Sequence, residues 1–279
     1  ASGWEVHIAA PAVEEMPGLR EKLSSMGVGL HEIPLSRTGT NPIADIGLVL
    51  SLRRLMRELR PGVVLPYTIK PVIYGTIAAW MAGVPKRFAL VTGLGYAFTG
   101  NRKGIVKQVV SWLYRFALGL TDKVFFQNPD DERLFRQLGL LPANIPSVVV
   151  NGSGVDVAEF SVQPLPAGAP VFLMIARLLG DKGVREYADA ARRIKRANSG
   201  VTLQLAGWID SNPDAIAQSE LDAWVADGTL EFLGKLDDVR PAIAASTVYV
   251  LPSYREGTPR TVLEAMAMGR PIITTDAPG

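Results

Sequence analysis

The stretch VFLMIARLLGDKGVREYADAARRI, residues Val171 to Ile194, has the pattern of a buried strand, a short loop and an amphipathic helix. The apolar run Val171 to Ala176 predicts the strand, and Asp181 is the expected N-cap of the helix. The apolar positions then recur at helical spacing: Val184, Tyr187, Ala188, Ala191 and Ile194. Strand, loop and helix together form the repeating unit of a parallel sheet covered by helices.

The same alternation continues from one end of the chain to the other. The β-rich runs are WEVHIAA, VGLHEI, GVVLPY, RFALVTG, KVFFQN, SVVV, VFLMIA, VTLQLAG, LEFLG, VYVLPS and PIITT. Helical patterns lie between them, as at Ile43 to Leu59, Pro71 to Met81 and Gly104 to Leu120. A single Rossmann-like sheet rarely holds so many strands, so we expect an α/β protein with two such domains.

The longest interruption rich in Gly, Pro and Ser is Asn151 to Pro170, where we expect the domain boundary. We assign residues 1–158 to an N-terminal domain and 159–279 to a C-terminal domain. The chain begins abruptly at ASGWEVHIAAP and stops abruptly after RPIITTDAPG. We therefore expect truncation at both ends, with an initial strand and helix and a longer C-terminal piece outside this sequence.

Composition excludes several classes of protein. The 279 residues are 48% hydrophobic and 20% charged, which is typical of a globular protein with a large core. A net charge of +2 gives little support for nucleic-acid binding. The absence of Cys excludes disulfides and thiolate sites, and it is compatible with a reducing cytoplasm. No apolar run is long enough to span a membrane, and the N-terminus has no charged region followed by an apolar signal core.

Two cations, Arg177 and Lys182, lie on the loop between the strand and the helix of the opening stretch. In open α/β sheets such loops lie at the carboxyl edge, where ligands bind, and two cations there suit a diphosphate. The alternative is that both are solvated surface charges.

A second stretch, TVYVLPSYREGTPRTVLEAMAMGRP, again has the pattern strand, loop, helix. We expect Thr258 as N-cap, Pro259 at the first helical position and Gly269 as C-cap. The free N–H groups of Arg260, Thr261 and Val262 would then form a seat for a phosphate.

Two carboxylates flank this seat. Glu264 lies one turn into the helix, where it can accept both hydroxyls of a ribose, and Glu256 precedes the seat, where it can accept hydroxyls of whatever the diphosphate carries. The alternative makes Glu264 an exposed helix residue and Glu256 a loop charge. However, Glu264 has apolar neighbours on both sides, and a carboxylate there needs partners.

The pattern R-L-x-x-x-K-G followed by P-S-x-x-E-G-x-P-x-x-x-L-E-A-M-A-x-G-x-P-I, from Arg177 to Pro271, resembles the nucleotide-sugar half of the retaining GT-B glycosyltransferases of family 4. The resemblance implies two Rossmann-like domains facing across a cleft, with residues 1–158 on the acceptor side and 159–279 binding the nucleotide sugar. It implies transfer of a hexosyl or N-acetylhexosaminyl group with retention at the anomeric carbon.

The resemblance also implies roles for individual residues. Arg177 and Lys182 would neutralise the diphosphate, Glu264 would bind the ribose and Glu256 the transferred sugar, which makes Glu256, Arg177 and Lys182 the catalytic set. The turn of the donor seat would comprise Gly257, Thr258, Pro259, Arg260 and Thr261. The chain has no Asp-x-Asp, so we expect neither a metal nor a cofactor.

The N-terminal half contains VTGLGYAFTG, Val91 to Gly100. Its glycine spacing is not the dinucleotide fingerprint, so we reject a nicotinamide site. The loop resembles bacterial enzymes that extend lipid-linked oligosaccharides, including N-acetylgalactosaminyltransferases acting on undecaprenyl diphosphate. That likeness places Thr92, Gly93, Gly95 and Tyr96 on the acceptor side. Many relatives carry a His here, whereas this chain has only His7 and His31, which we interpret as ordinary strand residues.

Residues 102–120 combine apolar positions at helical spacing with Arg102, Lys103, Lys107 and Arg115. This pattern suits a helix lying on anionic lipid, and equally a core helix with a solvated start.

We therefore expect a cytoplasmic enzyme, at the inner face of the inner membrane if it is peripheral, that moves a sugar from a UDP-sugar to a lipid-linked saccharide acceptor. Its product would be a bacterial surface glycan such as lipopolysaccharide. The leaving diphosphate would assist deprotonation of the acceptor. Two alternatives stay open: a sugar-nucleotide isomerase of the 2-epimerase type, and a non-catalytic subunit that binds a sugar nucleotide.

Overall fold

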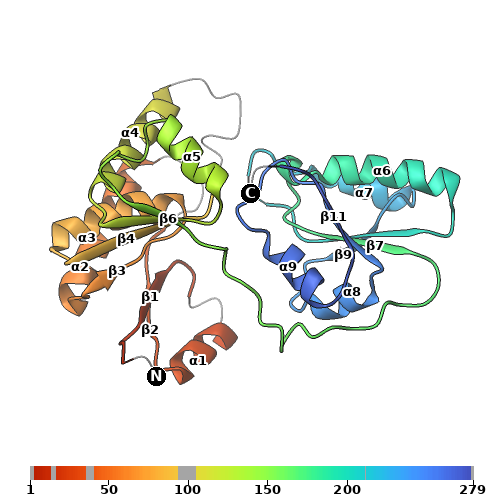
Figure 1. Ribbon diagram of the computed structural model, residues 1–279, viewed down its shortest axis with the longest axis horizontal. Coiled ribbons are helices and arrows are strands. Elements are labelled where there is room, and N and C mark those ends of the chain that lie inside the picture. Colours follow the sequence, from red (N-terminus) through yellow and green to blue (C-terminus); the bar gives the residue numbers. More distant parts are fainter. Residues whose placement is uncertain (1–2, 14–16, 36–40, 94–104, 211, 278–279) are drawn as a thin grey trace. The chain divides into compact units, whose positions relative to one another are not determined.

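The computed structural model describes residues 3–13, 17–35, 41–93, 105–210 and 212–277 (Figure 1). By its internal contacts the chain divides into two units. Unit 1 comprises Ala1–Phe126 and Glu132–Val150, and unit 2 comprises Gln127–Asp131 and Asn151–Gly279. Each unit is a parallel α/β structure, as the alternation of β-rich and helical runs predicted.

Unit 1 holds two parallel groups of strands. β1 (His7–Ala10) pairs with β2 (Gly29–Glu32), and a four-stranded sheet has the order β3-β4-β5-β6. The four strands are β3 (Val63–Val64), β4 (Lys86–Val91), β5 (Lys123–Phe126) and β6 (Ser147–Val149). The helices are α1 (Pro17–Ser25), α2 (Pro42–Leu59), η1 (Pro71–Gly75, a π-helical turn), α3 (Thr76–Ala82), α4 (Ile105–Gly119) and α5 (Pro129–Gln137), of which the residues up to Asp131 belong to unit 2.

Helix α2 shows how the local sequence sets an element's ends. The side chain of Asn41 accepts hydrogen bonds from the N–H groups of Ile43 and Ala44, and Pro42 occupies the first turn, where its missing N–H costs nothing. The helix ends at Leu59, and its C-cap Arg60 has a left-handed backbone. The result is a helix over the residues that the periodicity of Ile43 to Leu59 predicted.

Unit 2 holds one five-stranded parallel sheet with the order β11-β10-β7-β8-β9. Its strands are β7 (Val171–Ile175), β8 (Thr202–Ala206), β9 (Glu231–Gly234), β10 (Val248–Leu251) and β11 (Ile272–Thr274). Helices α6 (Val184–Ala197) and α7 (Gln218–Ala226) cover one face, and α8 (Arg240–Ala245) and α9 (Arg260–Ala267) cover the other (Figure 1). The core lies between the sheet and these helices, with Leu173, Met174 and Tyr249 fully buried.

The irregular segment after β6 belongs to unit 2 because it packs there. Phe160 is buried in the core of unit 2, and the guanidinium of Arg270 donates to the carbonyl oxygens of Gln163 and Pro164. The division between the units accordingly falls at Asn151, the start of the predicted interruption. Residues 151–158, which we assigned to the N-terminal domain, lie with unit 2.

Among the described residues, no helix is both long and apolar enough to cross a bilayer.

Candidate active site

The order of strands in unit 2 indicates where a ligand binds. The chain runs from β7 outward to β8 and β9, then returns to β10 on the other side of β7. The loops that follow β7 and β10 therefore leave neighbouring strands toward opposite faces of the sheet. A crevice at the carboxyl edge of a parallel sheet forms at such a switch in direction. Both predicted motifs lie on these two loops.

The loop after β7 differs locally from our prediction. Asp181 does not cap α6, because residues Gly180–Lys182 form a separate 3₁₀ turn and the helix starts at Val184. Gly183 joins the two with φ of 74°, and a Cβ there would lie 2.1 Å from the carbonyl oxygen of Pro252. Glycine is thus required for the backbone angle and for close approach to the end of β10. This approach brings Lys182 to the second loop.

Lys182 and Glu256 form the centre of the site. The ammonium of Lys182 lies 2.9 Å from Oε1 of Glu256 and 3.3 Å from the carbonyl oxygen of Arg255. The hydroxyl of Ser253 donates to the same carboxylate oxygen at 2.6 Å. Ser253 is buried, and both members of the ion pair are largely buried. Glu256 is therefore oriented by two donors from two loops.

Arg177 has a different partner. Its guanidinium lies 3.1 Å from Oδ2 of Asp210, on the loop that follows β8, and its side chain is 46% exposed. Burial raises the pKa of the neighbouring Asp181, with Lys182 acting against the shift. The two predicted cations thus lie on one loop, but each has a carboxylate partner of its own in the structure.

The start of α9 also differs in detail. Its N-cap is Pro259 and its first residue is Arg260, so Thr258 is not the cap. The N–H of Val262 donates to the carbonyl of Pro259, which removes it from the predicted seat. Arg260 and Thr261 carry the first two N–H groups of the helix, which have no acceptor within a helix. At the other end Met268 is the C-cap, and Gly269 follows it with φ of 79°.

Glu264 is buried, as its apolar neighbours indicated. Its side chain is 7% exposed, and Oε1 lies 2.8 Å from Nε of Arg260, one turn earlier on α9. Burial raises the pKa of Glu264, while the charge of Arg260 and its hydrogen bond oppose the shift. The prediction that this carboxylate needs a partner is confirmed, and the partner is a residue of the predicted seat.

The predicted acceptor residues lie only partly within the described structure. Thr92 and Gly93 follow β4 directly and are half-buried. Gly95 and Tyr96 lie outside the described residues. His7 and His31 lie in β1 and β2 as predicted, and they are partners: His7 Nδ1 is 3.0 Å from His31 Nε2.

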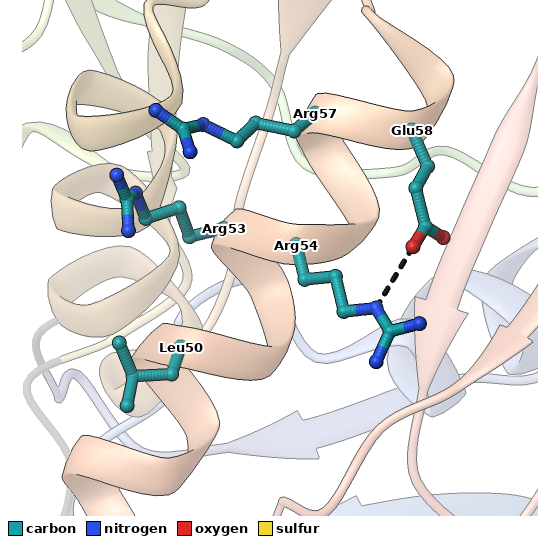
Figure 2. Close-up of a pocket in the computed structure, with 5 residues that line it drawn as sticks. All are labelled: Leu50, Arg53, Arg54, Arg57 and Glu58. Atoms are coloured by element: carbon teal, nitrogen blue, oxygen red, sulfur yellow. Dashed lines mark hydrogen bonds and ion pairs between the residues drawn. The ribbon is translucent and has the colours of Figure 1, made fainter.

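A pocket of about 300 Å³ lies elsewhere, on α2 of unit 1 (Figure 2). Its lining residues are Leu50, Arg53, Arg54, Arg57 and Glu58. Arg53 and Arg57 point to one side of the helix, and Arg54 pairs with Glu58 on the other (Figure 2). None of the predicted site residues lines this pocket.

Four residues at the site were missed by sequence reasoning. Ser253 stands in the P-S-x-x-E-G pattern, so its contact with Glu256 had a signal in the motif. Asp210, Asp131 and Arg255 act through contacts between segments far apart in sequence, for which a single sequence gives no signal. Across the described part of the chain, no three His, Cys, Asp or Glu side chains gather as ligands for a metal ion.

Comparison with known proteins places this site in a family. Residues 169–279 match a family model described as "Glycosyl transferases group 1", and residues 1–152 match one described as "Glycosyl transferase 4-like domain". The chain belongs to the glycosyltransferases. The resemblance carried by the motifs from Arg177 to Pro271 is thereby confirmed.

Two relatives show what members of the family do. This glycosyltransferase is 29% identical over 291 residues to the N,N'-diacetylbacillosaminyl-diphospho-undecaprenol alpha-1,3-N-acetylgalactosaminyltransferase of Campylobacter jejuni, over 99% of this chain and 74% of the relative. It is 31% identical over 251 residues to the UDP-Gal:alpha-D-GlcNAc-diphosphoundecaprenol alpha-1,3-galactosyltransferase of Escherichia coli, over 85% of this chain and 63% of the relative.

Solved structures confirm the fold of this glycosyltransferase. Sucrose-phosphate synthase (tll1590) from Thermosynechococcus elongatus matches with a TM-score of 0.72 at 16% identity, over 99% of this chain and 82% of that one. Anabaena Alr3699/HepE in complex with UDP and glucose matches with a TM-score of 0.68 at 18% identity, over 93% and 71%. The fold class is GT-B, with two Rossmann-like units, as predicted.

Proposed function

We propose that this glycosyltransferase moves a sugar from a UDP-sugar to a lipid-linked saccharide, with retention at the anomeric carbon. The observation that carries the proposal is the meeting of Lys182, Glu256 and the start of α9 at the switch point between β7 and β10. A diphosphate needs cations and free N–H groups, and a sugar needs a fixed acceptor of its hydroxyls. The two loops supply both sets of groups.

Each group has a part in the proposed reaction. Lys182 has three donors, so it can keep its contact with Glu256 while it binds a phosphate oxygen. Arg177 and the N–H groups of Arg260 and Thr261 would share the charge that builds on the leaving diphosphate. Glu264 would accept the ribose hydroxyls, and Glu256 those of the sugar. The leaving phosphate accepts the proton of the acceptor hydroxyl, so the reaction needs no nucleophile from the enzyme. The cations and the N–H groups take the place of a metal.

The donor proposal has support from structural relatives. Anabaena Alr3699/HepE was solved in complex with UDP and glucose and with UDP-glucose, and the pneumococcal O-GlcNAc transferase GtfA in complex with UDP and GlcNAc. These complexes favour UDP over other nucleotides for this chain.

The acceptor proposal rests on the two curated relatives and on helix α4. Both relatives act on saccharides linked to undecaprenol through a diphosphate, as their names state. In α4, Tyr114, Ala117 and Leu118 are buried, whereas Val109, Trp112 and Phe116 form an exposed apolar stripe. Trp112 and Phe116 stack with their ring centroids 5.6 Å apart. A helix with one face in the core and an apolar stripe outside suits contact with a bilayer at the cytoplasmic face.

A panel of UDP-, GDP- and ADP-sugars tests the donor by thermal shift. A ligand at 100 times its Kd stabilises by about 2.7 kcal/mol, so we expect a clear rise in Tm with UDP-sugars alone. Transfer to an undecaprenyl-diphosphate saccharide, followed by NMR of the new anomeric proton, then tests retention. Activity should persist in chelator. Free isomerised UDP-sugar without an acceptor would favour the isomerase, and binding without turnover would favour the non-catalytic subunit.

A further inference from the structure

A short segment far from the motifs in sequence holds the loop that carries Glu256. Gln127–Asp131 follows β5, and by its contacts it is part of unit 2. The side-chain amide of Asn128 donates to the carbonyl oxygen of Gly257 at 3.2 Å. The hydroxyl of Thr258 lies 3.2 Å from the carbonyl oxygen of Gln127. Two residues of the segment therefore contact the loop directly after Glu256.

The third contact comes directly before Glu256. The guanidinium of Arg255 forms an ion pair with Oδ1 of Asp131, whose side chain is fully buried. Oδ2 of Asp131 accepts from the amide of Asn128 at 3.0 Å, and the N–H of Asp131 donates to Oδ1 of Asn128 at 2.7 Å. A fully buried carboxylate is stable only with a cation and hydrogen bonds. The guanidinium of Arg255 is therefore held beside Asp131.

Arg255 itself is not fully satisfied. Its Nε is buried with no hydrogen-bond partner among the described residues. Leaving a buried donor unpaired costs free energy. We infer that the ion pair with Asp131 sets the position of this guanidinium, because the position does not satisfy all of its donors. The ion pair therefore fixes the loop and not only the side chain.

The consequence concerns Glu256. Residues 255, 257 and 258 are all tied to Gln127–Asp131, while Glu256 between them turns to Lys182 and Ser253. Gly152 packs against the same loop so closely that a Cβ there would lie 2.6 Å from Cγ2 of Thr258. We propose that Asp131 is a positioning residue, which through Arg255 holds Glu256 where it meets the hydroxyls of the donor sugar. The proposal rests on the proposed role of Glu256.

Asp131→Asn tests it, because this change keeps the shape and removes the charge. The seat for the diphosphate and ribose lies on α9 and on Lys182, so the Kd of UDP, measured by calorimetry, should stay within about twofold of the wild type. Displacing a reacting or positioning group by about 1 Å can cost up to about 100-fold in rate. We therefore expect kcat with UDP-galactose or UDP-N-acetylgalactosamine to fall at least about tenfold.

Arg255→Gln should likewise lower kcat and leave the Kd of UDP unchanged. The kcat of the double variant should be no lower than that of the poorer single variant, because both changes break the same contact. The matched control is Glu220→Gln, which removes the charge and one of the two acceptor oxygens that bind Arg185, at 2.8 and 2.9 Å, elsewhere in unit 2. It should leave kcat and the Kd of UDP within about twofold. Wild-type kcat in Asp131→Asn, or an equal loss of UDP binding and turnover, would overturn the proposal.

Glu256→Gln separates this proposal from the proposed function. If Glu256→Gln turns over normally, the assignment of Glu256 to the donor sugar is wrong whatever Asp131 does. If Glu256→Gln is impaired and Asp131→Asn is not, only the positioning role fails. Should Asp131→Asn not fold, Arg255→Lys keeps a cation beside Asp131 but loses the planar fork. It should lower kcat at least about threefold with the Kd of UDP unchanged, and an unchanged kcat would overturn the proposal.

Discussion

Two glycines that follow parallel strands, Gly183 in unit 2 and Gly93 in unit 1, have very different surroundings. In unit 2, a Cβ on Gly183 would strike the backbone of Pro252, and Glu256 is bound by Lys182 and Ser253. In unit 1, Gly93 follows β4 with φ of 140°, yet a Cβ there would meet none of the described residues within 4 Å. Contacts thus restrict the choice of residue in unit 2 far more than at Gly93. We infer that close packing and the backbone angle together require glycine at position 183, whereas at position 93 the backbone angle alone favours it.

The largest expected effect is on the cations of unit 2. Arg177→Ala and Lys182→Ala should each lower kcat at least about 100-fold, because a donor to the charge that builds in the transition state is worth about 2.7 to 4 kcal/mol. The double variant should lose less than the product of the two, since both cations act on one diphosphate.

The matched control lies in unit 1. Arg54 is an exposed arginine of α2, paired with Glu58 at 2.8 Å (Figure 2). Arg54→Ala should leave the steady-state kcat within about twofold, because such surface pairs contribute little. Equal losses in Arg54→Ala and Arg177→Ala would remove the distinction between the units.

The next effect separates the two carboxylates of the donor site. Glu264→Ala should weaken UDP and UDP-sugar alike, by about tenfold or more, since both contain the ribose and a hydrogen bond to a charged group is worth about 1.5–3 kcal/mol. Glu256→Ala should spare UDP and lower turnover. Calorimetric titration measures the Kd of UDP in each variant. An equal loss of UDP affinity in both variants would contradict the assigned roles.

A smaller effect tests the exposed stripe of α4 in unit 1. Trp112→Ser should weaken binding to anionic vesicles in a sedimentation assay by roughly 1 kcal/mol, or about fivefold, through lost apolar burial. Trp80→Ser on α3 is the matched control, since Trp80 is also exposed and lies on another helix. Unchanged vesicle binding in Trp112→Ser would return α4 to the role of a core helix.

The smallest effect concerns stability and pH. Burial raises the pKa of Glu264 above its ordinary value of 4.5, so the charged form is disfavoured in the folded state. Stability contributed by this group is present below pH 4.5 and is lost as pH rises through the raised pKa. The Tm of Glu264→Gln should therefore match the wild type below pH 4.5 and exceed it at pH 7.5. A wild-type Tm that is higher at pH 7.5 would show that the pairing with Arg260 outweighs burial.

Much of the fold was readable because its signals are local. Each predicted β-rich run contains a strand, and the helices near Ile43 to Leu59 and Gly104 to Leu120 formed within a few residues of their predicted ends. The errors lie at caps, where a neighbouring segment competes for the side chain. Thr258 contacts the carbonyl of Gln127 and does not cap α9, and Asp181 enters a 3₁₀ turn because Gly183 must approach β10.

The candidate site shows the same limit. Lys182, Glu256 and Glu264 were identified from a motif of neighbouring residues, and the structure gives each of them a partner. Asp131 stands 124 positions from Arg255, so only the folded chain brings them together. A single sequence specifies which groups a site contains more readily than which distant residues hold them.

Three cations near the donor site are each paired with a carboxylate, and this affects the rate at which a donor binds. Arg177, Lys182 and Arg260 each face a carboxylate, from Asp210, Glu256 and Glu264 respectively. These six groups sum to no net charge, so they project little field beyond a Debye length of about 8 Å at physiological salt. An approaching nucleotide diphosphate is therefore not steered over long distances, and its association rate should vary little with ionic strength. Only a ligand that has already reached the loops comes close to the cations. The site therefore selects its ligand through short-range contacts, and long-range attraction does not concentrate other polyanions there.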